Sequence, residues 1–256
     1  MIIDRKTYIE KLQRSKGNGL IKIITGLRRS GKSFLLKKLF RQHLLDDGVN
    51  EDHILIIDME SRKNKAFKDP DYLLDWVESK MLDDSTYYII IDEVQEVNDF
   101  VEVLSTLSVT EGTDVYVTGS NSRFLSSDVV TEFRGRGDEI HVWPLSFKEF
   151  MSVYESNKED GWAEYLMYGG LPQLLTQDGD EKKADFLRRL YRTVYLRDIY
   201  ERNNIELKPE FEELSKTIAS SIGAPVNASN IANTFKSGTF PTRPYLPIWD
   251  ICRMPS

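Results

Sequence analysis

The stretch that decides the fold is ITGLRRSGKSF, residues 24–34, in which Gly26–Ser33 has the spacing G-x-x-x-x-G-K-S. Glycines allow backbone N–H groups to turn inward around phosphate oxygens. Lys32 offers a point charge to β- and γ-phosphates, and Ser33 offers a hydroxyl to Mg²⁺. We therefore predict a phosphate site formed by the whole loop: Gly26, Leu27, Arg28, Arg29, Ser30, Gly31, Lys32 and Ser33.

The flanking sequence favours the same interpretation. Leu20–Thr25 is rich in β-branched residues and predicts a strand, and a helical pattern follows from Lys32 to about Leu45. A helix that begins at the loop directs its positive N-terminal end at a bound anion. For Arg28 and Arg29, contact with a nucleotide and exposure to solvent are both open.

Four further short apolar runs predict strands that alternate with helical stretches. Helices are expected over residues 70–82, with Pro70 in the first turn, and over residues 100–107. This alternation predicts βαβ units and a mainly parallel, five-stranded sheet with helices on both faces. The additional strands are expected at Ile54–Asp58, Tyr87–Ile91, Asp114–Thr118 and Glu139–Val142.

An acidic pair follows the strand expected at Tyr87–Ile91. Ligands of open α/β sheets bind at the carboxyl ends of the strands, where Asp92 and Glu93 stand. We predict that Ser33 and Asp92 hold Mg²⁺, Asp92 through water, and that Glu93 polarises an attacking water as a general base. Asp58 and Glu60, after the second strand, are expected to support this site or to be solvated.

Two later segments carry additional polar candidates. Asn121 or Ser120, after the fourth strand, would sense the γ-phosphate or orient water if that strand neighbours the third; a helix N-cap is the alternative. Arg134 and Arg136 precede the fifth strand. A guanidinium there could neutralise transition-state charge in cis or from a neighbouring subunit, and exposed or structural charge is the alternative.

The second half of the chain is expected to be helical. Ser146 can cap a helix, and Gly161–Tyr168, Lys182–Arg202 and Glu210–Ser221 have helical patterns. The excess of basic residues in Lys182–Arg202 fits a solvated helix face better than a contact with nucleic acid or an acidic partner. We expect three regions: a P-loop core over residues 1–145, a helical domain over 146–236 and an irregular proline-rich tail over 237–256.

Composition excludes several classes of protein. The 256 residues are 40% hydrophobic and 29% charged, which excludes a wholly disordered chain. The net charge of −7 disfavours indiscriminate nucleic-acid binding. One cysteine, Cys252, cannot form an internal disulfide, and three separated histidines predict no metal cluster. Without a membrane span or a signal peptide, the expected location is the cytoplasm.

Several motifs together resemble a known family. ITGLRRSGKS, IIIDEVQ, VTGSNS, FRGRG and PLSFKEF look like bacterial and archaeal AAA+-type ATPases that carry a C-terminal domain of unknown function. The segments YGGLPQLL and YLRDIYERNNI look like the opening of that second domain. The resemblance implies an ASCE-type P-loop fold with Walker A at Gly26–Ser33, Walker B at Asp92 and the catalytic glutamate at Glu93. It also implies a sensor within Ser120–Asn121 and an arginine finger at Arg136.

The end of the chain departs from this pattern. The family continues into a winged-helix-like element, of which Glu210–Phe235 resembles the incomplete start. Pro241, Pro244, Pro247 and Pro255 then interrupt any helical or strand period. We expect the sequence after about Phe235 to be truncated or read in a different frame.

The resulting functional hypothesis is an ATP-binding, Mg²⁺-dependent ATPase that couples hydrolysis to movement of its helical domain. An ATP-gated binding module with negligible turnover is the alternative, and a kinase or a DNA-associated regulator is less favoured. The preference for ATP follows from the resemblance. A homo-oligomer and a protein partner are compatible with the sequence, whereas a membrane is not expected.

Overall fold

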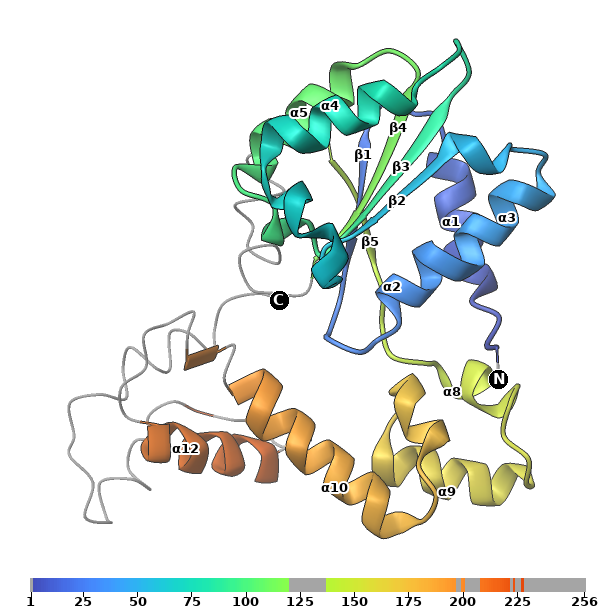
Figure 1. Ribbon diagram of the computed structural model, residues 1–256. Helices are drawn as coiled ribbons and strands as arrows, with labels where there is room; N and C mark the ends of the chain where they lie inside the picture. The colour runs from blue at the N-terminus through green and yellow to red at the C-terminus, as the bar shows by residue number, and fades with distance from the viewer. Residues whose placement is uncertain are drawn as a thin grey trace. The chain divides into compact units, whose positions relative to one another are not determined.

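The structure is a computed structural model that describes residues 2–119, 137–196, 199–200, 208–221, 223 and 227 (Figure 1). Its sheet has the strand order β2-β3-β4-β1-β5, and every pair of neighbours is parallel. The predicted five-stranded parallel sheet is confirmed, and each strand lies within two residues of its expected position. The strands are β1 (Ile21–Thr25), β2 (Ile54–Asp58), β3 (Tyr87–Asp92), β4 (Thr113–Thr118) and β5 (Gly137–His141).

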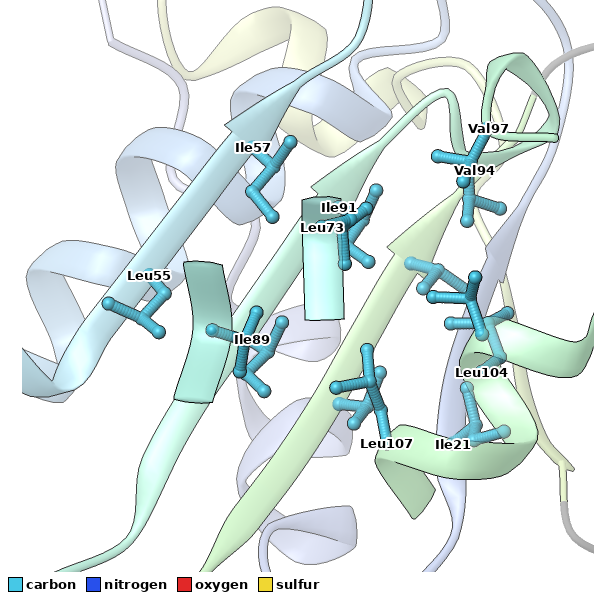
Figure 2. Close-up of a cluster of buried hydrophobic side chains, with 14 of the residues drawn as sticks. Ile21, Leu55, Ile57, Leu73, Ile89, Ile91, Val94, Val97, Leu104 and Leu107 are labelled. Carbon is cyan, nitrogen blue, oxygen red and sulfur yellow. The ribbon is translucent and has the colours of Figure 1, made fainter. Parts of the chain in front are cut away.

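Helices cover both faces of this sheet (Figure 1). One face packs against α4 (Pro70–Lys80) and α5 (Phe100–Val109), and Figure 2 shows their Leu73, Leu104 and Leu107 against the strands. The other face packs against α1 (Lys6–Ser15) and a helix that follows the phosphate loop. That helix consists of α2 (Lys32–Phe34), the π-helical segment η1 (Leu35–Phe40) and α3 (Arg41–Asp46).

The alternation of side chains along β2 and β3 determines which face of the sheet their last residues point to. Ile57 and Ile91 belong to the core beneath α4 and α5. The next residues, Asp58 and Asp92, therefore face the helix that follows the phosphate loop. Both aspartates stand at the carboxyl end of their strands, and they are register partners. The fold thus delivers two neighbouring carboxylates to the same edge of the sheet.

Local capping agrees with the sequence. Pro70 is in the first turn of α4, and the Asp69 side chain accepts a hydrogen bond of 3.0 Å from the Tyr72 N–H. Ser146 caps α8 (Phe147–Met151) and exchanges hydrogen bonds with Glu149 in a capping box. Three short 3₁₀ segments complete this half of the chain: η2 (Glu51–His53), η3 (Arg62–Lys68) and η4 (Val94–Glu96).

A helical region follows β5. It contains α8, α9 (Lys158–Tyr168), η5 (Pro172–Thr176) and α10 (Asp180–Leu190). Gly170 accepts a hydrogen bond of 2.7 Å from the Leu145 N–H, and a Cβ at Gly170 would lie 2.1 Å from the Leu145 carbonyl oxygen. This close approach explains the second glycine of the YGGLP sequence.

The chain forms two compact units, Met1–Leu187 and Arg188–Ser256. The first unit holds the sheet together with α8 and α9, so the boundary at residue 145 stays a prediction. The second unit begins within α10 and includes η6 (Tyr191–Tyr195) and α12 (Lys208–Ser220). The tail over residues 237–256 lies outside the described residues. Among the helices described, we find none with the length and apolar character that crossing a membrane requires.

Candidate functional site

The phosphate loop connects β1 to α2. Gly31 is the residue before α2, and its φ of +100° lies in the left-handed region, which glycine tolerates. The Lys32 side chain returns to the loop, where its Nζ donates to the Gly26 and Leu27 carbonyls at 2.9 and 3.0 Å. The loop therefore curls around the buried Lys32 ammonium group.

Gly26 is the tightest position in this loop. Its φ is +132°, and a Cβ there would lie 2.2 Å from the Val142 carbonyl oxygen. We expect Gly26→Ala to destabilise the protein by about 1–3 kcal/mol, because strain and a backbone clash coincide. Urea unfolding measures the effect. Gly48→Ala is the control, because Gly48 has a φ of +86° and, in the described part of the chain, no atom lies within 4 Å of a Cβ added there. An equal loss in both variants would contradict the clash.

The environment of Lys32 alters its acidity. Burial lowers the pKa of Lys32 below its ordinary value, although the charges of Glu93 and Asp92 act in the opposite direction. Only the protonated ammonium attracts phosphate. We therefore expect ADP affinity to fall as the pH rises, starting below the ordinary lysine pKa of 10.5. Calorimetric titrations between about pH 7 and pH 10 measure this; constant affinity across that range would contradict it.

Asp92 is the best-anchored side chain of the site. It is 1% exposed. Its Oδ1 accepts from the Ser33 hydroxyl at 2.8 Å and from the Thr118 hydroxyl at 2.5 Å, and its Oδ2 lies 2.6 Å from the Lys37 Nζ. Hydroxyl and carboxylate oxygens are donors that Mg²⁺ prefers. The adjacent Ser33 and Asp92 oxygens therefore fit the predicted metal.

Glu93 follows with an unusual backbone. Its φ is +57°, and its N–H donates to the Thr118 hydroxyl oxygen at 3.0 Å. The residue is 8% exposed, and the Gln95 amide donates to its Oε2. Thr118 thus contacts both members of the acidic pair. The proposed role of Ser120 or Asn121 requires that the fourth strand neighbour the third, and β4 does neighbour β3.

A cleft of about 700 Å³ opens beside Glu93. Arg28 of the phosphate loop lines it, together with residues of η3 and Glu60. Burial, helped by the charges of Glu93 and Asp92, raises the pKa of Glu60. Arg28 and Glu93 therefore share one opening.

Arg29 and Ser30 contact other parts of the first unit. The Arg29 guanidinium donates to the Gln173 side chain at 2.9 Å and lies 5.5 Å from the centre of the Phe186 ring. The Ser30 carbonyl accepts from Arg5 at 3.1 Å. These contacts connect the phosphate loop to the helical region and to the segment before α1.

Not every predicted residue can be placed. Ser120, Asn121, Arg134 and Arg136 lie outside the described residues. Conversely, Thr118, Lys37 and Arg5 contact the site or its loop and were not predicted from the sequence. Thr118 had a usable signal, since it ends the strand beside β3. Lys37 also had one, because it lies four residues after Ser33 on the same helix face.

The fold and the site define a P-loop domain of the nucleotide-binding, ATPase-like class. The chain belongs to the AAA domain family, whose model matches residues 18–151. The model of a domain of unknown function matches residues 159–248, past Phe235. The resemblance to ATPases that carry such a C-terminal domain is confirmed.

Two curated relatives are uncharacterized proteins. One, from Haemophilus influenzae, is 32% identical over 247 residues, which cover 94% of this chain and 61% of that protein. The other, from Methanocaldococcus jannaschii, is 27% identical over 231 residues, which cover 84% of this chain and 50% of that protein. The chain thus spans about three fifths and one half of the length of these relatives.

Two of the similar solved structures have low sequence identity to this chain. The Aeropyrum pernix ORC1 protein in complex with DNA has a TM-score of 0.45 at 12% identity, covering 98% of this chain and 84% of that one. AMPPCP-bound DnaA from Aquifex aeolicus has a TM-score of 0.43 at 14% identity, covering 88% of this chain and 73% of that one.

Proposed function

We propose that the protein is a Mg²⁺-dependent ATPase. The observation that carries the proposal is the hydrogen bond between the Ser33 hydroxyl and the buried Asp92 carboxylate, next to the Lys32 ammonium and Glu93. ATP hydrolysis requires groups that bind the phosphates, hold the metal ion and activate a water molecule. The site has a side chain suited to each of these tasks.

The proposed roles follow the chemistry of each group. When nucleotide binds, the Lys32 ammonium group donates to β- and γ-phosphate oxygens in place of the Gly26 and Leu27 carbonyls. The loop N–H groups hold the same phosphates. Ser33 and Asp92 hold Mg²⁺, which supplies charge neutralisation at the phosphates when bound. Asn121 and Arg136 remain proposed as γ-phosphate sensor and arginine finger, the latter in cis or from a neighbouring copy in a homo-oligomer.

Glu93 is the proposed general base. A base must be held within hydrogen-bond reach of the water that it activates. The Glu93 N–H donates to Thr118 and the Gln95 amide donates to the Glu93 carboxylate, contacts that restrict the backbone and the side chain. The carboxylate also lines the cleft, through which water can approach.

Two arginines support a coupling between hydrolysis and the helical region. Arg29 connects the phosphate loop to Gln173. Arg5 connects the Ser30 carbonyl to Glu149 of α8, with N–O distances of 3.1 and 2.9 Å. A shift of the loop on phosphate release would strain both contacts. We propose that this strain moves the helices that follow Pro144.

Product analysis tests the proposed reaction. Purified protein is incubated with ATP and Mg²⁺, and ADP and free phosphate are measured in parallel. An ATPase releases both in equal amounts, and EDTA stops the release. ADP without free phosphate, with the γ-phosphoryl group transferred to the protein or to an added acceptor, would indicate a kinase. Bound ATP with neither product would indicate the ATP-gated binding module.

A further inference from the structure

Lys37 lies between two carboxylates of the sheet edge. Its Nζ is 2.8 Å from Asp58 Oδ2 and 2.6 Å from Asp92 Oδ2. Lys37 belongs to η1, a π-helical segment, and such segments are frequent at functional sites. Lys37 is the fourth residue after Ser33, so one helix face contacts both oxygens of Asp92: Ser33 contacts Oδ1 and Lys37 contacts Oδ2.

The two carboxylates need a cation. Asp58 and Asp92 are register partners on adjacent parallel strands, whose backbones lie about 4.8 Å apart. Like charges directly opposite each other in a sheet are destabilising. Glu60 and Glu93 add negative charge in the same neighbourhood. A polyanionic nucleotide would meet this excess of negative charge on entering the site.

We propose that Lys37 is a positioning residue of the nucleotide site, which bridges Asp58 and Asp92, offsets their repulsion and holds Asp92 with its Oδ1 toward Ser33. This inference rests on the proposed function, because it assumes that Mg²⁺ and nucleotide bind at Ser33 and Asp92. Lys37 acts through Asp92 and Asp58 and does not touch the reacting phosphate. Its effect is therefore on affinity for the nucleotide with its metal.

A charge-balance experiment tests the proposal. Affinity for ATP is measured with and without Mg²⁺ in wild type, Lys37→Met, Asp58→Asn and the Lys37→Met/Asp58→Asn double variant. Lys37→Met is expected to weaken Mg²⁺-dependent binding about ten- to hundredfold, the size of one charge-assisted hydrogen bond. The double variant is expected to recover most of this loss, because it removes one negative charge along with the positive one.

Two further variants separate charge from structure. Lys37→Arg keeps the charge and is expected to retain most of the affinity. Lys38→Met removes the same formal charge from an exposed position on the same helix, and it is expected to bind ATP as wild type does. A loss as large in Lys38→Met as in Lys37→Met would overturn the proposal, because general electrostatics would then explain the effect.

The bridge is also tested without nucleotide. A double-mutant cycle on urea unfolding measures the coupling between Lys37 and Asp58, and a positive coupling is expected. Absence of coupling overturns the proposal even if ATP binding changes. Wild-type affinity in Lys37→Met overturns it and leaves the proposed ATPase intact. Failure of wild type to bind ATP overturns the proposed function and this inference together.

Discussion

Glu93→Gln is expected to lower phosphate release from ATP by about 10²–10⁴-fold and to leave ATP affinity nearly unchanged. Glutamine has the shape of glutamate and lacks a carboxylate that accepts a proton. The Glu93 N–H, which donates to Thr118, is unaffected by the change. Loss of kcat with retained binding identifies an interaction used in the transition state. Single-turnover phosphate release and ATP titration measure the two quantities.

Glu96→Gln is the matched control for this variant. Glu96 is exposed, and its carboxylate pairs with Lys68 at 2.7 Å. Exposed ion pairs contribute little, so both turnover and stability are expected to match wild type. Turnover retained in Glu93→Gln, or lost equally in Glu96→Gln, would contradict the assignment of Glu93 as the base.

Arg5→Met is expected to have the largest effect on stability, about 3 kcal/mol. The Arg5 side chain is 6% exposed and ion-paired with Glu149 at 2.9 Å. It also donates to the Ser30 and Trp143 carbonyls at 3.1 and 2.8 Å. Methionine fills similar space but removes the partner of Glu149 Oε1 and the Arg5 donors to the two carbonyls. Urea unfolding monitored by fluorescence measures the loss.

The neighbouring Lys6 provides the control for Arg5. Its ammonium lies 3.6 Å from Asp4, and both side chains are more than 70% exposed, at 78% and 72%. Lys6→Met is therefore expected to change stability by less than about 0.5 kcal/mol. An Arg5→Met variant as stable as Lys6→Met would show that the buried network contributes little.

Much of the fold could be predicted because its signals are local. Tyr87–Asp92 is a short apolar run that ends in an acidic residue, and the phosphate loop has a fixed spacing. Parallel strands bring their carboxyl ends to one edge, so the meeting of Ser33 and Asp92 follows from topology. The sequence therefore predicted these two residues together.

The contacts that were missed join distant parts of the chain. Arg5 contacts Trp143, which is 138 positions away in sequence, and no periodicity links the two. The role of Lys37 depends on the register of β2 against β3, which pairs Asp58 with Asp92. Hydropathy patterns report which face of a strand is buried, but they do not report which residue lies beside it on the neighbouring strand.

Phosphate release from ATP by wild type and Lys32→Ala, with ATP binding measured in both, tests the central claim most directly. We predict that wild type binds ATP, and that it releases phosphate only when Mg²⁺ is present. Lys32→Ala, which lacks the ammonium group of the phosphate loop, is predicted to lose both activities. Wild type that binds no ATP, or that binds it without releasing phosphate, would contradict the assignment as an ATPase.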